Sequence, residues 1–139
     1  MKVITDFVNI TTRGNSDIVD ITGEVASCLS RTGLKEGQVT IFASGSTAGV
    51  TSIEYEPGLL KDIPEALDRL APEGAPYHHD DTWGDGNGHA HVRAAMIGAS
   101  FSVPFVSGRM LLGTWQQIVV IDCDNRSRSR RIAVQIIGE

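Results

Sequence analysis

All four histidines of this chain lie between His78 and His91, in a segment that also carries several aspartates. Neutral imidazole is the commonest metal ligand among protein side chains. A carboxylate beside it can ligate the metal, orient a ligand or move protons. Three glycines in the same segment allow the backbone to fold tightly and bring such groups together: Gly84, Gly86 and Gly88. The sequence therefore predicts that any catalysis resides here.

The spacing of these histidines predicts a metal site. His89 and His91 are two positions apart, and on an extended backbone that spacing places both imidazoles on one face. His78 and His79 are adjacent, so we expect only one of them to join the site. Three imidazoles with one open position are typical of catalytic zinc, whereas flanking aspartates favour manganese, iron or magnesium. We expect a divalent metal, with zinc preferred. The alternative is a polar surface loop whose histidines are solvated.

Further polar side chains are candidates for proton transfer or substrate binding. Asp85 and Asn87 are placed to orient the histidines or to contact substrate. Glu54 follows an apolar strand and is a candidate base or outer partner of the site if it points inward. Arg93 is a candidate phosphate ligand, with a salt bridge on a helix surface as the alternative.

Two other segments could contact a ligand. Backbone N–H groups and hydroxyls of the small-residue turn at Ser46 and Thr47 could form an anion nest for a phosphate, and an ordinary tight hairpin is the alternative. Trp115 and Gln116 interrupt an apolar strand. A buried glutamine needs hydrogen-bond partners, which a ligand or subunit packing could supply. The charged connection 124–130 is expected to be a solvated loop.

The hydrophobic pattern predicts an α+β fold. Strand clusters at both ends of the chain, with two to three short helices between them, indicate a mainly antiparallel β-sheet with the helices packed on it. A first helix is predicted after Thr22, with Val25, Cys28 and Leu29 on its apolar face and Gly33 as its cap. A second is predicted to start at Pro64, and a third at Val92, after a long connection over residues 71–91. Strands are predicted over 1–12, 17–21, 38–43, 47–55, 100–106, 110–122 and 132–137.

Composition restricts the class of protein. The chain has 139 residues, 41% of them hydrophobic, and a net charge of −5, which argues against nucleic acid or anionic lipid as partner. The two cysteines do not form a disulfide framework and are expected to be buried thiols in a reducing compartment. No apolar run is long enough to span a membrane, and the N-terminal residues lack a signal-peptide core. We expect one domain over residues 1–139, in the cytoplasm.

Three motifs resemble the YjbQ-like family along essentially the whole chain. The first is the histidine segment with its Asn-Gly-His-Ala-His sequence at 87–91, the second is Ser-Val-Pro-Phe at 102–105, and the third is Leu-Gly-Thr-Trp-Gln-Gln at 112–117. The family is named for a secondary thiamine-phosphate synthase activity. The resemblance implies compact homotrimers built on a meandering, half-barrel-like antiparallel sheet. It also implies that the histidines cluster in a pocket near the subunit contact. It matches the family's histidines to His79, His89 and His91.

One position departs from the resemblance. Many members carry His-Thr-Thr-Ala where this chain has Gly45-Ser46-Thr47-Ala48, so Gly45 stands in place of a histidine. We therefore expect a metal-assisted enzyme that couples or cleaves phosphorylated small molecules. The missing histidine makes thiamine-phosphate synthase-like transfer a weaker expectation for this chain than for the histidine-bearing branch. The alternatives are a non-catalytic trimeric protein that binds a metal or ligand and a metal-dependent hydrolase.

Overall fold

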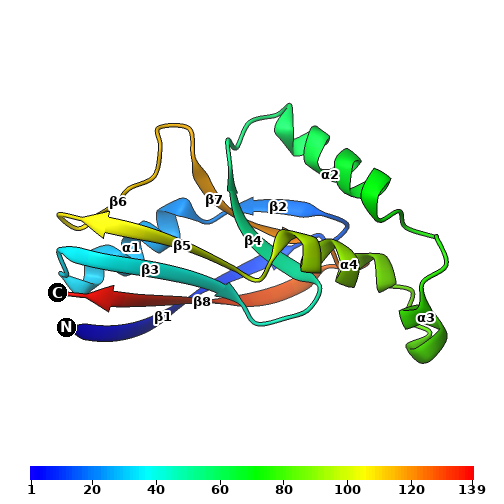
Figure 1. Cartoon of the computed structure of the whole chain (residues 1–139), viewed down its shortest axis with the longest axis horizontal. Helices are drawn as coiled ribbons and strands as arrows, with labels where there is room; N and C mark the ends of the chain where they lie inside the picture. Colours follow the sequence, from blue (N-terminus) through cyan, green and yellow to red (C-terminus); the bar gives the residue numbers. More distant parts are fainter.

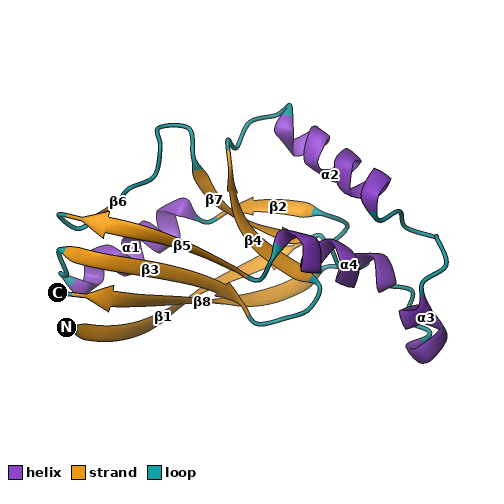
Figure 2. Ribbon diagram, in the orientation of Figure 1, coloured by secondary structure: helices purple, strands orange, loops and turns teal.

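The computed structural model describes all 139 residues and contains eight strands and four helices. Figures 1 and 2 show a curled, mainly antiparallel sheet with helices packed on it, which confirms the predicted α+β class. The sequence predicted two to three helices, and the fourth forms inside the segment that was expected to be a long connection. The strands are β1 (Lys2–Thr12), β2 (Asp17–Asp20), β3 (Glu36–Ala43), β4 (Ala48–Ile53), β5 (Ser100–Val106), β6 (Arg109–Met110), β7 (Gln117–Asp122) and β8 (Arg128–Gly138).

Five strands form the larger sheet, in the order β1-β8-β3-β5-β6. Successive side chains of a strand alternate between its two faces, so every second residue points to the core. On β8, Ile132, Val134 and Ile136 are buried, whereas Arg131 and Ile137 are exposed. The helix α1 (Thr22–Thr32) buries Val25, Cys28 and Leu29, as its apolar spacing predicted, and ends at Gly33 with φ 72°.

The smaller sheet has the order β2-β7-β4. Its central strand β7 is apolar on both faces, and its residues Ile118 to Asp122 are all buried. That continuous burial explains why β7 does not show the alternation of a half-exposed strand. The predicted strand 110–122 is shorter than expected: residues 111–116 form a loop and turn between β6 and β7.

The helix α2 (Leu59–Leu70) begins before Pro64 rather than at it. Glu56 accounts for the earlier start, because its carboxylate accepts the backbone N–H groups of Gly58 (2.8 Å) and Leu59 (2.5 Å). These bonds satisfy donors that have no partner within the helix. Pro64 is therefore accommodated inside the helix, where the sequence placed a boundary.

The histidine segment lies at the far end of the molecule from the two chain termini. Figure 1 shows α3 (His78–Trp83) and α4 (Gly88–Ile97) on one side and both termini on the other. None of the four helices is long and apolar enough to cross a lipid bilayer.

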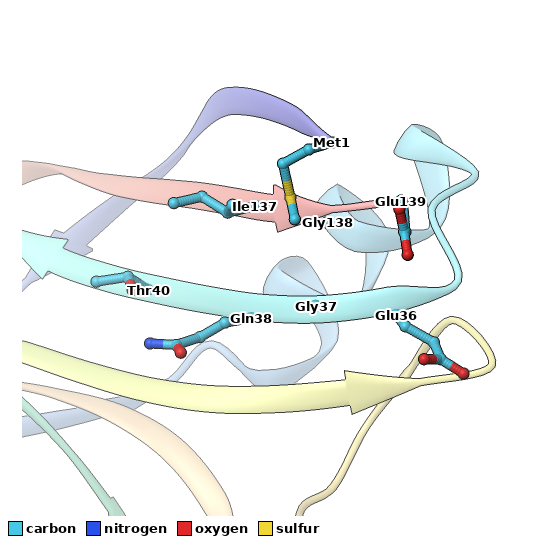
Figure 3. Close-up of a pocket in the computed structure, with 8 residues that line it drawn as sticks. All are labelled: Met1, Glu36, Gly37, Gln38, Thr40, Ile137, Gly138 and Glu139. Carbon is cyan, nitrogen blue, oxygen red and sulfur yellow. The ribbon is translucent and has the colours of Figure 1, made fainter.

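A hollow of about 470 Å³ opens at the end of the larger sheet where both termini lie (Figure 3). Met1, Gln38 and Ile137 line it together with the carboxylate-bearing Glu36 and Glu139. No histidine lines this hollow. The histidines that were predicted to form the site lie at the opposite end of the fold (Figure 1).

Candidate functional site

The histidine segment folds as two short helices rather than as an extended loop. The helix α3 ends at Gly84, which has a φ of 71° that favours glycine. The helix α4 begins at Gly88, four residues before the predicted start at Val92. Asp80 of α3 accepts the Gly88 N–H at 2.9 Å, so a side chain from one helix caps the first turn of the next.

His79 of α3 and His91 of α4 lie side by side. Their ring centroids are 4.2 Å apart, and the ring planes are tilted by 50°. Asn87 Oδ1 lies 3.1 Å from His79 Nε2, and Asp85 Oδ1 lies 3.7 Å from the same nitrogen. The predicted orienting residues therefore surround the histidine that comes from α3. His78, the neighbour of His79, is exposed instead.

His89 does not join this pair. It lies two positions from His91 on a helix, where that spacing places side chains on nearly opposite faces. The expectation of a shared face rested on an extended backbone and is wrong. The His89 side chain is 1% exposed, with the Tyr77 ring centroid 6.4 Å from its own. Burial lowers the pKa of His89 below its usual 6.5, and the positive charge of Arg93 acts in the same direction.

The geometry fits a metal only in part. The chain brings together two of the three predicted histidine ligands, His79 and His91, with Asp85 close to the first. No group of three or more His, Cys, Asp or Glu side chains is arranged to hold a metal ion. Catalytic zinc takes three protein ligands, so one copy of the chain supplies an incomplete set.

A hollow of about 400 Å³ lies next to the histidine pair. His91 lines one side of it, and Ser46 and Gly45 of the turn between β3 and β4 line the other. The remaining walls are made of alanines and a glycine at the end of α4, so the space has few bulky side chains. Thr47, predicted to act beside Ser46, is buried instead, and its hydroxyl donates to Asp124 Oδ2 at 3.1 Å.

Arg93 lies in the interior rather than on the surface. It is 3% exposed, and it donates to the backbone oxygen of Ala71 (2.9 Å), to Ser16 Oγ (3.0 Å) and to Asp68 Oδ1 (2.6 Å). These contacts connect α4 with α2 and with the turn after β1. Arg93 therefore joins elements of the fold, and the predicted phosphate contact has no support in its surroundings.

Three predicted residues lie at the opposite end of β4 from Ser46. Glu54 follows the last residue of β4 and is exposed, so it does not point inward. Trp115 is 71% exposed in a turn, where the predicted strand alternation does not apply. Gln116 accepts the Gly113 N–H and donates to Ser52 Oγ, both at 3.0 Å. The predicted site is thus divided into two groups separated by the length of a strand.

The sequence analysis missed a buried charged network beside the β3–β4 turn. Arg130 donates twice to Asp122, at 2.8 and 3.0 Å, and once to Thr47 Oγ1, at 2.8 Å. Arg128 pairs with Asp124 at 2.6 Å. The connection 124–130 was predicted to be solvated, and residues 125–127 are exposed as expected, but Asp124 is buried, as is Asp122 at the end of β7. Burial raises the pKa of Asp122, and hydrogen bonds from Arg130 and Thr12 outweigh it, so the pKa lies below its usual value.

The comparisons with known proteins agree along the whole chain. A family model described as "UPF0047 protein YjbQ-like" matches residues 6–139. A UPF0047 protein of Methanothermobacter thermautotrophicus is 35% identical over all of this chain and 95% of its own length. The UPF0047 protein YugU of Bacillus subtilis is 34% identical over 94% of this chain and 97% of its own.

Solved structures show the same fold. A YbjQ-like protein of unknown function from Sulfolobus solfataricus superposes with a TM-score of 0.93 at 33% identity, and the match covers 99% of both chains. A hypothetical protein from Aeropyrum pernix gives a TM-score of 0.91 at 34% identity, over 98% of this chain and 99% of its own. Strand order and helix placement are therefore shared with experimental structures.

Proposed function

The chain belongs to the YjbQ-like UPF0047 family, and from this membership we propose that it is an enzyme acting on a phosphorylated small molecule. The observation that carries the proposal is the His79–His91 pair, with ring centroids 4.2 Å apart and His91 on the wall of a hollow of about 400 Å³. Such a hollow is large enough for a small metabolite. The reaction we propose resembles secondary thiamine-phosphate synthesis, in which a pyrimidine pyrophosphate is coupled to a thiazole phosphate.

The histidine pair is suited to the leaving group of that reaction. The thiazole nitrogen forms a bond to the pyrimidine methylene carbon as the bond from that carbon to pyrophosphate breaks. Negative charge then grows on the pyrophosphate oxygens, and His91, which lines the hollow, would donate a proton to them. His79 is held by Asn87 and lies near the Asp85 carboxylate, so it can support positive charge on the pair.

A divalent metal is part of the proposal, with zinc preferred and manganese, iron or magnesium as alternatives. His79 and His91 would hold it as neutral imidazoles, and its charge would then neutralise the leaving pyrophosphate in place of the proton from His91. Two imidazoles are fewer than the three protein ligands of a catalytic zinc site. The remaining donors would come from substrate oxygens or from a second copy of the chain.

Association of copies into a homotrimer also belongs to the proposal. Val92 and Met96 of α4, one helical turn apart, are 40% and 50% exposed, and Trp83 at the end of α3 is 73% exposed. These apolar side chains lie on the two helices that carry the histidine pair, and contact with a second copy would cover them. Both cysteines are buried and unpaired, which supports a reducing location such as the cytoplasm.

The proposal is tested with purified protein, a pyrimidine pyrophosphate and a thiazole phosphate, assayed with zinc and with a chelator. We expect His91→Gln and His79→Gln each to lower the rate roughly a hundredfold or more, the range of a lost acid–base group. His78→Gln is the matched control, because that neighbouring histidine is exposed and outside the pair. The proposal fails if the two pair variants retain the wild-type rate. Zinc binding without turnover of any phosphorylated substrate would favour the non-catalytic alternative.

A further inference from the structure

We propose that a second hollow, lined by Arg128, Arg130 and Arg131, binds the phosphoryl group of the ligand. This hollow has a volume of about 300 Å³, and Gly45 of the β3–β4 turn lines both it and the hollow at His91. None of its ten lining residues is acidic. Asp122 and Asp124 pair with Arg130 and Arg128, so the three arginines leave one unmatched positive charge at the hollow, which favours an anion.

The hollow exists because β8 is paired on only one side at its beginning. Residues 128–131 of β8 pair with β1, whereas pairing with β3 starts at Ile132 opposite Ala43. Beyond Ala43 the chain turns away through Ser44 and Gly45 into β4. The first four residues of β8 therefore face a gap in the sheet, and side chains from both sides of the strand reach it.

Arg130 is oriented for a ligand in this gap. Its Nε and Nη2 are occupied by Asp122 and Thr47, while Nη1 has no hydrogen-bond partner in the chain. The protein has no fully buried side-chain nitrogen or oxygen without a partner, so Nη1 retains some contact with solvent. A Cβ built on Gly45 would lie 3.0 Å from this atom. Nη1 thus points over the glycine, where a side chain would obstruct an incoming group.

Arg131 supplies a charge that no carboxylate neutralises. The negative charges of Asp122 and Asp124 match those of Arg130 and Arg128, and no salt bridge involves Arg131. Its guanidinium carbon lies 3.6 Å above the Phe7 ring centroid, which fixes the side chain while leaving its N–H edge available. Arginine forks bind phosphate oxygens in pairs, and donors from two directions suit a tetrahedral group.

The two hollows are neighbours, since Gly45 and Ala48 line both of them. A phosphoryl group held by Arg130 and Arg131 would leave the rest of a ligand free to extend past Gly45 toward His91. The assignment rests on the proposed function only for the class of ligand, a phosphorylated small molecule. The assigned phosphate ligands are Arg130 and Arg131, which line the hollow, rather than Arg93, whose donors are hydrogen-bonded inside the fold.

Calorimetric titration of the full chain with inorganic phosphate, with a phosphate monoester and with acetate tests the assignment. We expect both phosphates to bind with a dissociation constant of about 1 mM or lower, and acetate to bind at least roughly tenfold more weakly. Tighter binding of the monoester would show that the ligand body contributes. Equal affinity for acetate, or no saturable phosphate binding, would overturn the assignment.

Variants locate the site. Arg131→Gln and Gly45→Ala should each weaken phosphate binding roughly tenfold, the first by removing the unmatched charge and the second by crowding Nη1. Arg126→Gln is the control, because Arg126 is exposed, lies on the same connection and does not line the hollow. Unchanged affinity in both site variants would refute the location. Phosphate binding by Arg131→Gln and turnover by His91→Gln are measured separately, so failure of this assignment is distinguishable from failure of the catalytic proposal.

Discussion

Arg130 and Asp122 form an ion pair inside the protein, with two hydrogen bonds of 2.8 and 3.0 Å and side chains that are 9% and 0% exposed. The carboxylate also accepts the hydroxyl of Thr12 at 2.7 Å. This arrangement ties the end of β7 to the start of β8 and to the last residue of β1. It positions the arginine whose remaining donor faces the phosphoryl hollow.

Removal of the Asp122 carboxylate should destabilise the fold strongly. Asp122→Ala leaves the Arg130 guanidinium largely buried without its counter-charge, and such a loss costs about 3–5 kcal/mol. The free energy of unfolding is measured by urea denaturation. Arg13→Ala is the comparison, because the Arg13 side chain is 88% exposed in its pair with Asp17 and should contribute less than about 1 kcal/mol. Equal effects of the two substitutions would contradict the buried network.

Arg93 should contribute more to stability than its charged partner does. Arg93→Ala leaves Ser16 and the Ala71 carbonyl without their hydrogen bonds, and we expect a loss of about 3 kcal/mol. Asp68→Ala removes one of the three bonds of Arg93 at a side chain that is 68% exposed, where water can replace it, and should cost about 1–2 kcal/mol. Thermal and urea unfolding of both variants measure the difference. If Arg93→Ala unfolds like the wild type, Arg93 is not the structural connection described above.

His89 should make the fold less stable in mild acid. Burial holds its pKa in the folded protein below 6.5, while the unfolded chain takes up a proton near 6.5. Stability is therefore unaffected by this group above pH 6.5 and decreases as the pH falls below it, until the folded pKa is reached. Urea unfolding of the wild type and of His89→Gln between pH 7.5 and 5 measures the slope. His89→Gln should lack this loss of stability at low pH, whereas His78→Gln should keep it.

Gly49 and Gly23 should respond to alanine in opposite directions. A Cβ on Gly49 of β4 would lie 2.5 Å from Ile97 Cγ2 and 2.8 Å from the Gly98 oxygen, so Gly49→Ala should cost about 1–3 kcal/mol by overpacking β4 against α4. A Cβ on Gly23 of α1 would meet no neighbouring atom within 4 Å, and Gly23→Ala should stabilise by about 0.5–1 kcal/mol. Thermal melting distinguishes the two. Tolerance of alanine at position 49 would argue against the close β4–α4 contact.

Both thiols should resist modification in the folded protein. Cys28 and Cys123 are 2% and 0% exposed, and burial raises the pKa of Cys123 to about 11. Because the thiolate is the reactive form, Ellman's reagent at pH 8 should label neither cysteine rapidly until denaturant is added. Fast reaction of either thiol under native conditions would contradict the burial.

The sequence predicted best where periodicity and local turn chemistry agree. The α1 positions Val25, Cys28 and Leu29 are buried as expected, and Gly33 ends the helix with the positive φ that its residue type favours. The predicted helix starts were wrong where a side chain outside the helix determines its first residue. Glu56 starts α2 ahead of Pro64 and Asp80 starts α4 at Gly88, and neither residue belongs to the helix that it caps.

The sequence predicted that three histidines of one segment converge, and the structure brings only two of them together. His79 and His91 meet because two helices pack together, and His89 turns inward because it lies on a helix. The pattern of alternate residues could not distinguish a helix from an extended loop among so many glycines. Asp122 and Arg130 were missed because their pairing depends on the approach of two strands, although charges at the end of the apolar run 118–121 were a visible signal.

The bond from the Gly88 N–H to Asp80 joins α3 and α4 through contacts that are local in sequence. Every group that holds the His79–His91 pair therefore lies within thirteen consecutive residues, and none of them belongs to a β-strand. Because these contacts are local, we expect this unit to open and reclose while the sheets stay folded, as local units of many proteins do in native-state hydrogen exchange. Amide protons of this unit should then exchange sooner than those of β7 and β8, and a ligand could enter the histidine pair without unfolding the molecule.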